Sequence, residues 1–200
     1  KNREEQVAMM YLLDEKVTVL ALGGIAGAGK SMLALAAGRQ GVRSKKYDKV
    51  LVFRSMYEVG QQKVGFLPGD LDQKMEPWSA AVWDNIAKID KMSGIKSTTI
   101  PAGDGSTPSL QSGVRVRHAD DIEVQPISYI RGRTFDNSFI IVDDAQSLEL
   151  NDLITILTRA GHGTKVVFTF DMDQQDNPNP HMSKGTSIIA LIDMTKDNPM

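Results

Sequence analysis

The sequence predicts a three-layer α/β domain built on a mainly parallel sheet. Short apolar runs rich in β-branched residues alternate along the chain with segments of helical periodicity. These runs are continuously apolar, which is typical of strands that are covered by helices on both faces. The 200 residues are 41% hydrophobic and 24% charged, as expected of a soluble globular chain with a sizeable core. We therefore expect residues 1–200 to form a single domain.

Each expected strand is a short, largely apolar run. In chain order these runs are Val17–Leu22, Val50–Phe53, Ser138–Val142 and Lys165–Phe170. The segments between them carry apolar residues at helical spacing. They are Gln6–Leu13, Ser31–Arg39, Pro77–Met92 and Leu148–Arg159. Pro77 is placed at the start of its helix because proline favours the first turn. A hairpin or an added strand is expected at Ile122–Ile127.

Residues 93–120 interrupt this alternation. The stretch 93–113 is rich in Gly, Ser, Thr and Pro, so it predicts a surface insertion and not a linker between domains. From Asp176 onward the chain opens with a turn-rich DNPNP stretch and holds one apolar run, Ile188–Ile192. We expect this end of the chain to be a truncated C-terminus.

Charge and cysteine content exclude several classes of protein. The formal net charge of −2 argues against a broadly basic coat for nucleic acid, although a local basic face is compatible with it. The absence of cysteine excludes disulfides and thiolate metal sites. No apolar stretch approaches the ~18 residues that a membrane span needs. We therefore expect a cytoplasmic location and no membrane partner.

A glycine-rich stretch joins the first expected strand to a helix. Residues 24–31 are GIAGAGKS and match the phosphate-loop pattern G-x-x-x-x-G-K-[ST]. The glycines allow the backbone to direct N–H groups at an anion, and the helix that begins near Lys30 adds its positive dipole end. Lys30 would contact the β- and γ-phosphates of a bound nucleotide, and the Ser31 hydroxyl would ligate Mg²⁺. The plainer alternative is a turn that serves only close packing. The residues expected to hold the nucleotide here are Gly24, Ile25, Ala26, Gly27, Ala28, Gly29, Lys30, Ser31 and Met32.

Two carboxylates follow the apolar run of residues 139–142. They are therefore expected at the carboxyl edge of the sheet, where open α/β folds bind ligands. Asp143 is placed to hold Mg²⁺, Asp144 to orient or polarise the attacking water, and Gln146 to sense the γ-phosphate. The alternative is that one of the acids merely caps the helix that follows.

A third strand end has the same layout. The run Lys165–Phe170 contains Thr169 near its end and is followed by Asp171 and Gln174. These three side chains would form a sensor of the phosphate state. The alternative is a simple turn. Near the N-terminus, Gln6 could contact the edge of adenine by paired hydrogen bonds. The alternative for Gln6 is an exposed polar position on a helix.

Arginines flank a glycine before the acid-bearing strand. Arg131 and Arg133 could act across a subunit interface as arginine fingers or contact RNA phosphates, and solvent exposure alone is the plainer interpretation. Arg159 is a weaker finger candidate. A further basic run would attract anions or simply be solvated. Its members are Arg39, Arg43, Lys45, Lys46, Lys49 and Arg54.

Several motifs together resemble the PhoH-like ATPases. The motifs are Asn2 with Gln6, the loop with its helix LALAAG at 33–38, GFLPGD at 65–70, Lys74-Met75, Pro77-Trp78, IRGRTF at 130–135, the acid pair with Ala145-Gln146, and Leu157-Thr158-Arg159. The resemblance runs in order across residues 1–176. GFLPGD and RGRTF are far more specific than a phosphate loop alone.

The resemblance implies a P-loop NTPase core similar to the first domain of superfamily 1 helicases. It also implies ATP hydrolysis, assembly as a homo-oligomeric, hexameric ring, and RNA or another single-stranded nucleic acid as a partner. The opening NREEQ resembles members fused behind a PIN nuclease domain, so that domain, fused or separate, is a further implied partner.

The sequence departs from the family pattern at three places. Asp144 stands where the family has Glu, Phe170 where it usually has Gly, and Ser55-Met56 where we expect a proline. The shorter Asp144 side chain moves its carboxylate back by about a bond length, and errors near 1 Å can lower a rate ~100-fold. Two hypotheses therefore stay open: a Mg²⁺-dependent ATPase acting on RNA, with unwinding activity, or a weakly hydrolysing ATP-binding module that acts as an assembly or regulatory switch.

Overall fold

The computed structural model describes residues 2–54, 71–93, 122–171, 173 and 186–196, with the side chains of 71–79, 186 and 195–196 left out. Its helices and strands, in chain order, are α1 Arg3–Leu13, β1 Val19–Gly23, α2 Lys30–Arg43, β2 Lys49–Arg54, α3 Leu71–Met92, β3 Ile122–Pro126, the 3-10 helix η2 Ile127–Ile130, β4 Ser138–Asp143, the 3-10 helix η3 Ala145–Ser147, α4 Leu150–Leu157, β5 Lys165–Phe170 and α5 Thr186–Lys196. The expected insertion and the GFLPGD motif lie outside the described residues, apart from Ser93.

The described strands form one five-stranded sheet in the order β1-β5-β4-β2-β3, and every pair is parallel. The predicted α/β class and parallel sheet are confirmed. The acid-bearing strand β4 therefore lies between β5 and β2. Because all strands run the same way, their carboxyl ends meet at a single edge.

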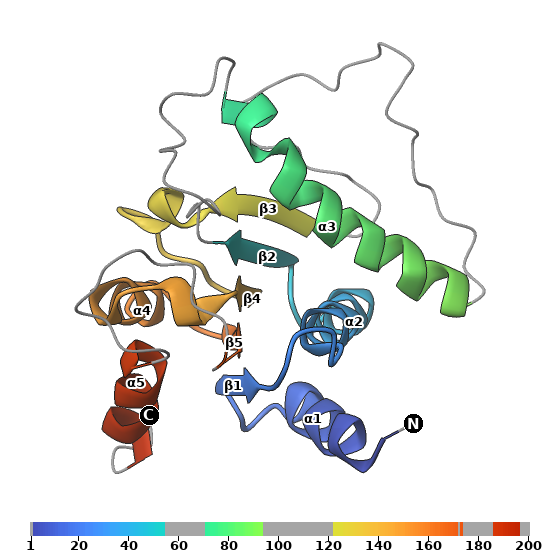
Figure 1. The fold of residues 1–200 in the computed structure, drawn as a ribbon, viewed down its shortest axis with the longest axis horizontal. Helices are drawn as coiled ribbons and strands as arrows, with labels where there is room; N and C mark the ends of the chain where they lie inside the picture. Colours follow the sequence, from blue (N-terminus) through green and yellow to red (C-terminus); the bar gives the residue numbers. More distant parts are fainter. Residues whose placement is uncertain (1, 55–70, 94–121, 172, 174–185, 197–200) are drawn as a thin grey trace.

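Helices cover both faces of this sheet and complete the three layers (Figure 1). α1, α2 and α3 pack on one face, where Phe139 and Ile141 of β4 point. α4 and α5 pack on the other face, where Ile140 and Val142 point. Alternate residues of each strand thus feed two separate cores, which is why the strands are continuously apolar.

The structure corrects several expected boundaries. β3 pairs with β2 in the same direction, so the segment Ile122–Ile127 supplies the added strand, one of the two alternatives expected there. α3 begins at Leu71, ahead of the predicted start at Pro77. α1 begins at Arg3 because Asn2 and Glu5 form a capping box that sequence periodicity did not reveal.

The capping alternative for the acid pair is also wrong. α4 begins at Leu150, and its N-cap is Glu149, not Asp143 or Asp144. Asp144 instead precedes η3 and makes no side-chain cap to it.

The basic run does not form one anion-attracting patch. Arg39 is buried and pairs with Asp90 of α3 at 2.7 Å, whereas Lys49 pairs with Glu123 at 3.1 Å and Arg54 with an acid of β4's carboxyl end. Helix and strand geometry point these side chains in different directions. In the parts of the chain that the structure describes, no helix is long and apolar enough to cross a bilayer.

Candidate functional site

The loop between β1 and α2 lies at the carboxyl edge of the sheet. Gly27 and Gly29 have φ angles of 78° and 83°, a region that residues with a Cβ rarely adopt. Gly29 is also the N-cap of α2, so the first N–H groups of that helix have no side-chain cap. The loop therefore presents a helix N-terminus beside backbone that only glycine adopts easily, as a phosphate site requires.

Lys30 folds back over this loop. Its Nζ atom donates hydrogen bonds to the Gly24 and Ile25 carbonyl oxygens at 2.7 and 2.9 Å. The ammonium group is thereby held above the loop, at the place where a bound phosphate would need a positive charge. Met32 lies in the first turn of α2, two residues after Lys30, and is partly buried.

Asp143 joins three separate elements. Its Oδ1 atom accepts hydrogen bonds from the Ser31 hydroxyl of α2 at 2.7 Å and the Thr169 hydroxyl of β5 at 2.5 Å. The Asp143 residue is 8% exposed. A hydroxyl and a carboxylate oxygen this close fit Mg²⁺, which uses one or two protein oxygens and completes its shell with water and phosphate. Among the described residues, no group of three His, Cys, Asp or Glu could hold a metal by itself.

The Asp144 side chain contacts β2, on the side of β4 opposite to β5. Its Oδ2 atom accepts hydrogen bonds from Arg54 Nε at 3.0 Å and Arg54 Nη2 at 2.6 Å. Its backbone is left-handed, with φ 56° and ψ 44°. Because β4 lies between β5 and β2, the two neighbouring acids contact opposite sides: Asp143 contacts β5 and the glycine loop's helix, and Asp144 contacts β2.

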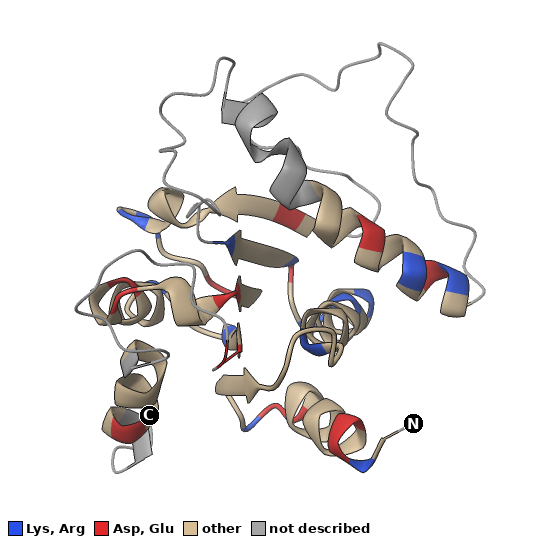
Figure 2. Cartoon of the chain, viewed as in Figure 1, with Lys and Arg blue, Asp and Glu red and all other residues tan. Residues whose placement is uncertain are grey.

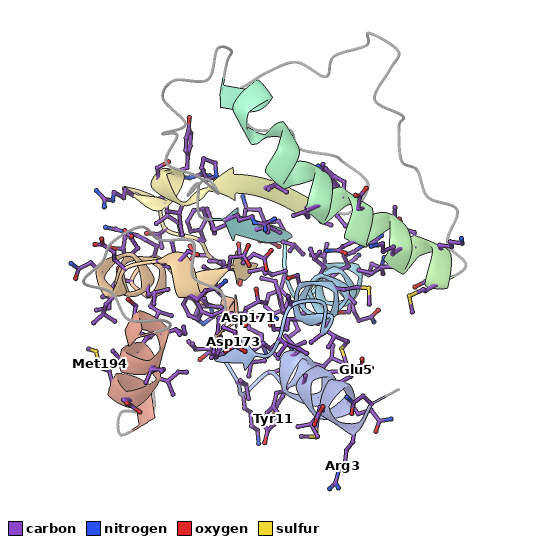
Figure 3. All side chains as sticks on the ribbon, viewed as in Figure 1. Arg3, Glu5, Tyr11, Asp171, Asp173 and Met194 are labelled. Atoms are coloured by element: carbon purple, nitrogen blue, oxygen red, sulfur yellow. The ribbon has the colours of Figure 1, made fainter. Side chains whose placement is uncertain are left out.

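Gln146 links the ends of two strands. Its Oε1 atom accepts a hydrogen bond from the backbone N–H of Asp171 at 3.1 Å, and the Gln146 residue is 1% exposed. The Asp171 carboxylate accepts from the N–H of Asp173 at 2.9 Å. Figure 3 shows Asp171 and Asp173 close together at the centre of the molecule. Gln174 lies outside the described residues.

The structure separates the two arginine-finger candidates. Arg133 Nη1 donates to Gln125 of β3 at 3.3 Å, and its guanidinium lies 5.1 Å from the centre of the Phe135 ring. The Arg131 side chain is 77% exposed and lies 3.8 Å from Asp152. Arg131 is therefore the freer of the two to reach another molecule, and both roles remain predictions. So do those of Gln6, which is exposed on α1, and of Arg159.

Two residues at this site were not predicted from the sequence. The sequence marks Arg54 only as part of a basic run. Arg54 also stands at the end of a strand, as Asp143 does, and this position could have indicated that it belongs to the site. Asn85 of α3 lines a cavity of about 20 Å³ together with Ser31 and Asp143, and nothing in its sequence context marks it. A cavity of that size holds about one water molecule.

Comparisons with known proteins agree on one family. The model of the family described as PhoH-like protein matches residues 1–199. Protein PhoH2 of Mycolicibacterium smegmatis is 40% identical over 201 residues, which cover 100% of this chain and 41% of that protein. Protein PhoH2 of Thermobispora bispora is 35% identical, with coverages of 100% and 42%. The chain thus spans about two fifths of the length of these curated relatives.

Among solved structures, an arterivirus helicase, nonstructural protein 10, aligns with 90% of this chain and 35% of its own. The sequence identity is 17% and the TM-score is 0.42.

Proposed function

This chain belongs to the family of PhoH-like proteins, and from that premise we propose that it binds ATP with Mg²⁺ at the loop between β1 and α2 and hydrolyses it. The observation that carries the proposal is the contact between Ser31 and Asp143 at 2.7 Å. It joins the residue after the loop lysine to the acid of β4, as a phosphate loop and its acidic partner must be joined to share one metal ion.

Each residue would have a separate task. The loop N–H groups and Lys30 would bind the phosphates, since Lys30 can exchange its two carbonyl partners for phosphate oxygens. Ser31 and Asp143 would hold Mg²⁺, which supplies charge neutralisation at the phosphates when bound. Thr169 would keep Asp143 in place, and Asp144 would orient the attacking water. Gln146 and Asp171 would transmit the state of the site between β4 and β5.

We further propose that turnover is coupled to RNA or another single-stranded nucleic acid, with unwinding as the outcome, in an oligomeric, hexameric ring in the cytoplasm. The motif resemblance supports this coupling, and so does the exposed guanidinium of Arg131, which is available to a neighbouring subunit or to a phosphate. A PIN nuclease domain, fused or separate, is part of the same proposal. Gln6 would contact the adenine.

The second candidate, a weakly hydrolysing switch module, is favoured by one observation. Arg54 holds Asp144 on the side of β2, away from the contacts that Asp143 makes. A carboxylate held there cannot orient water at the phosphates until it is released. The shorter side chain of Asp, compared with the family's Glu, adds to this effect.

Phosphate release with and without RNA tests both candidates. The parent chain is compared with Lys30→Ala and Asp144→Glu, and binding of a fluorescent ATP analogue is measured for each. An active ATPase loses binding and turnover in Lys30→Ala. If Asp144→Glu turns over strongly while the parent stays near background, the switch is supported. If Lys30→Ala binds the analogue as the parent does, the loop is not the site. Light scattering with and without ATP tests the ring.

A further inference from the structure

The contact between Arg54 and Asp144 carries an inference beyond ATP binding. We propose that Arg54 is a positioning residue, which holds Asp144 away from the nucleotide. A phosphate of a single-stranded nucleic acid then replaces the Asp144 carboxylate as the partner of the Arg54 guanidinium and releases Asp144. This inference rests on the proposed function. It adds Arg54 to the proposed machinery and links nucleic-acid binding physically to the position of Asp144.

The direction of the contact is its first support. The Cα atoms of Arg54 and Asp143 are partners in the register of β2 and β4, so Arg54 ends its strand beside the acid pair. Asp143 uses its carboxylate toward Ser31 and Thr169, on the side of the glycine loop. Asp144 is drawn to the other side. Release of Arg54 would leave Asp144 free to turn back toward the phosphates.

The strength of the contact is the second support. The Arg54 side chain is 25% exposed and the Asp144 side chain is 38% exposed. Ion pairs open to solvent are worth only ~0–1 kcal/mol, because water screens them. A phosphodiester can therefore compete for the guanidinium, which binds phosphate as well as it binds carboxylate. A fully buried pair could not be exchanged in this way.

The surroundings of Arg54 are the third support. Arg54 is the register partner of Pro126, where β3 ends, and η2 then leads to Arg131 and Arg133. Figure 2 shows Lys and Arg colouring at the arrowhead end of β2 and in the turn after η2. Arg54 thus ends β2, and Arg131 and Arg133 come after the carboxyl end of the adjacent strand β3 and η2, although the chain carries a net charge of −2. Such a row suits a sugar-phosphate backbone lying along this edge.

Thermodynamic reciprocity provides a test that needs no catalysis. If Arg54 must release Asp144 to bind phosphate, then removing the Asp144 charge must improve nucleic-acid binding. A fluorescein-labelled oligouridylate of about 20 nucleotides is titrated without ATP, at fixed salt, and followed by anisotropy. The variants are Asp144→Asn, Arg54→Gln and the two combined.

We expect Asp144→Asn to bind the oligonucleotide about 5-fold more tightly or better, within the usual range of coupling between sites. Arg54→Gln should bind more weakly, and the double variant should show no gain over Arg54→Gln. Arg54→Lys, which keeps the charge and loses the fork, should lie between the parent and Arg54→Gln. Asp48→Asn and Lys46→Gln are the controls, because they make the same changes of charge ahead of β2, at the opposite edge of the sheet.

A kinetic arm measures the other half of the exchange. Arg54→Gln should raise the basal kcat for ATP about 3-fold or more with KM unchanged, and the oligonucleotide should stimulate it no further. A merely structural role of Arg54 would instead lower kcat and the melting temperature together.

These measurements distinguish a failure of the Arg54 exchange from a failure of the proposed ATP site. The inference is overturned if Asp144→Asn gains no more affinity than Asp48→Asn, or if its gain persists without Arg54. It is also overturned if the parent binds an ATP analogue and no oligonucleotide, and in that case the ATP site stands. If the charge coupling appears but no variant binds the ATP analogue, the proposed ATPase fails while the Arg54 exchange survives.

Discussion

The ring of Phe170 lies against Gly23, its register partner on the neighbouring strand, so closely that a Cβ atom at Gly23 would come within 2.6 Å of Phe170 Cζ. The Phe170 carbonyl also accepts a hydrogen bond from the N–H of Gly24 at 3.2 Å, the first residue of the phosphate-loop pattern. The absence of a side chain at Gly23 is what leaves room for the Phe170 ring.

Gly23→Ala should therefore destabilise the protein by about 1–3 kcal/mol, the usual range for overpacking, and weaken binding of an ATP analogue. Phe170→Ala removes the obstacle, so Gly23→Ala should have little additional effect in that background. Urea unfolding and analogue titration of the two single variants and the double variant check this. Additive losses in the double variant would contradict the steric explanation.

Thr169→Val should weaken Mg²⁺ binding in the presence of nucleotide by about 10-fold or more, the usual loss when a group that holds a metal ligand is removed. Both the Ser31 and the Thr169 hydroxyls donate to Asp143, so if Ser31 ligates Mg²⁺ as proposed, Thr169 is the one of the two left to hold Asp143 in place. Titration of Mg²⁺ against the nucleotide-bound protein measures the effect. Thr155→Val on α4 is the matched control, because its hydroxyl donates to the Asn151 carbonyl within the same helix. Equal titration curves for the two variants would exclude the role of Thr169.

Arg39→Met should lower the free energy of unfolding by about 3–5 kcal/mol, because it leaves the Asp90 charge buried between α2 and α3. Replacing both partners, in Arg39→Met with Asp90→Leu, should recover most of that loss. Urea unfolding provides both values. Lys46→Met, at the more exposed pair with Glu15, should change stability by less than ~1 kcal/mol. A double variant as unstable as the single variant would refute this account.

The free energy of unfolding should rise with pH between about 8 and 10.5, because the pKa of buried Lys165 is lowered to about 8. Burial is the main cause, and nearby Lys46 adds to it. In that range the unfolded chain keeps the proton and the folded chain has lost it, so raising the pH favours folding, by roughly 1–3 kcal/mol.

Denaturant unfolding at several pH values, with Lys165→Met as the reference, measures this slope. The variant should be less stable overall, because it loses the hydrogen bonds from Lys165 Nζ to the Tyr11 and Asp14 carbonyls, but its slope should be flatter. Burial raises the pKa of Tyr47 above its ordinary value of 10.0. Above about pH 10 the Tyr47 hydroxyl ionises in the unfolded chain before it does in the folded protein, so this group lowers the free energy of unfolding only there. An unchanged slope in Lys165→Met would rule out Lys165 as its source.

Much of the fold could be predicted because the relevant signals are local. The strand Lys165–Phe170 matches its prediction at both ends, since six buried residues in a row leave little choice of structure. The start of α2 followed from the glycine loop. Ends that depend on a side-chain contact were missed, as at Asn2, where the capping box extends α1 toward the N-terminus.

The sequence by itself determined that a glycine loop with Lys30 and Ser31 follows one strand and that an acid pair ends another, because spacing and apolar runs fix local backbone. Only the tertiary structure decided which neighbours those side chains would have. Strand order puts β4 between β5 and β2, so Asp143 is bound to Thr169 while Asp144 is bound to Arg54. Register sets Phe170 against Gly23. Contacts between residues this far apart in the chain depend on how two hydrophobic cores pack the sheet, which no local pattern encodes.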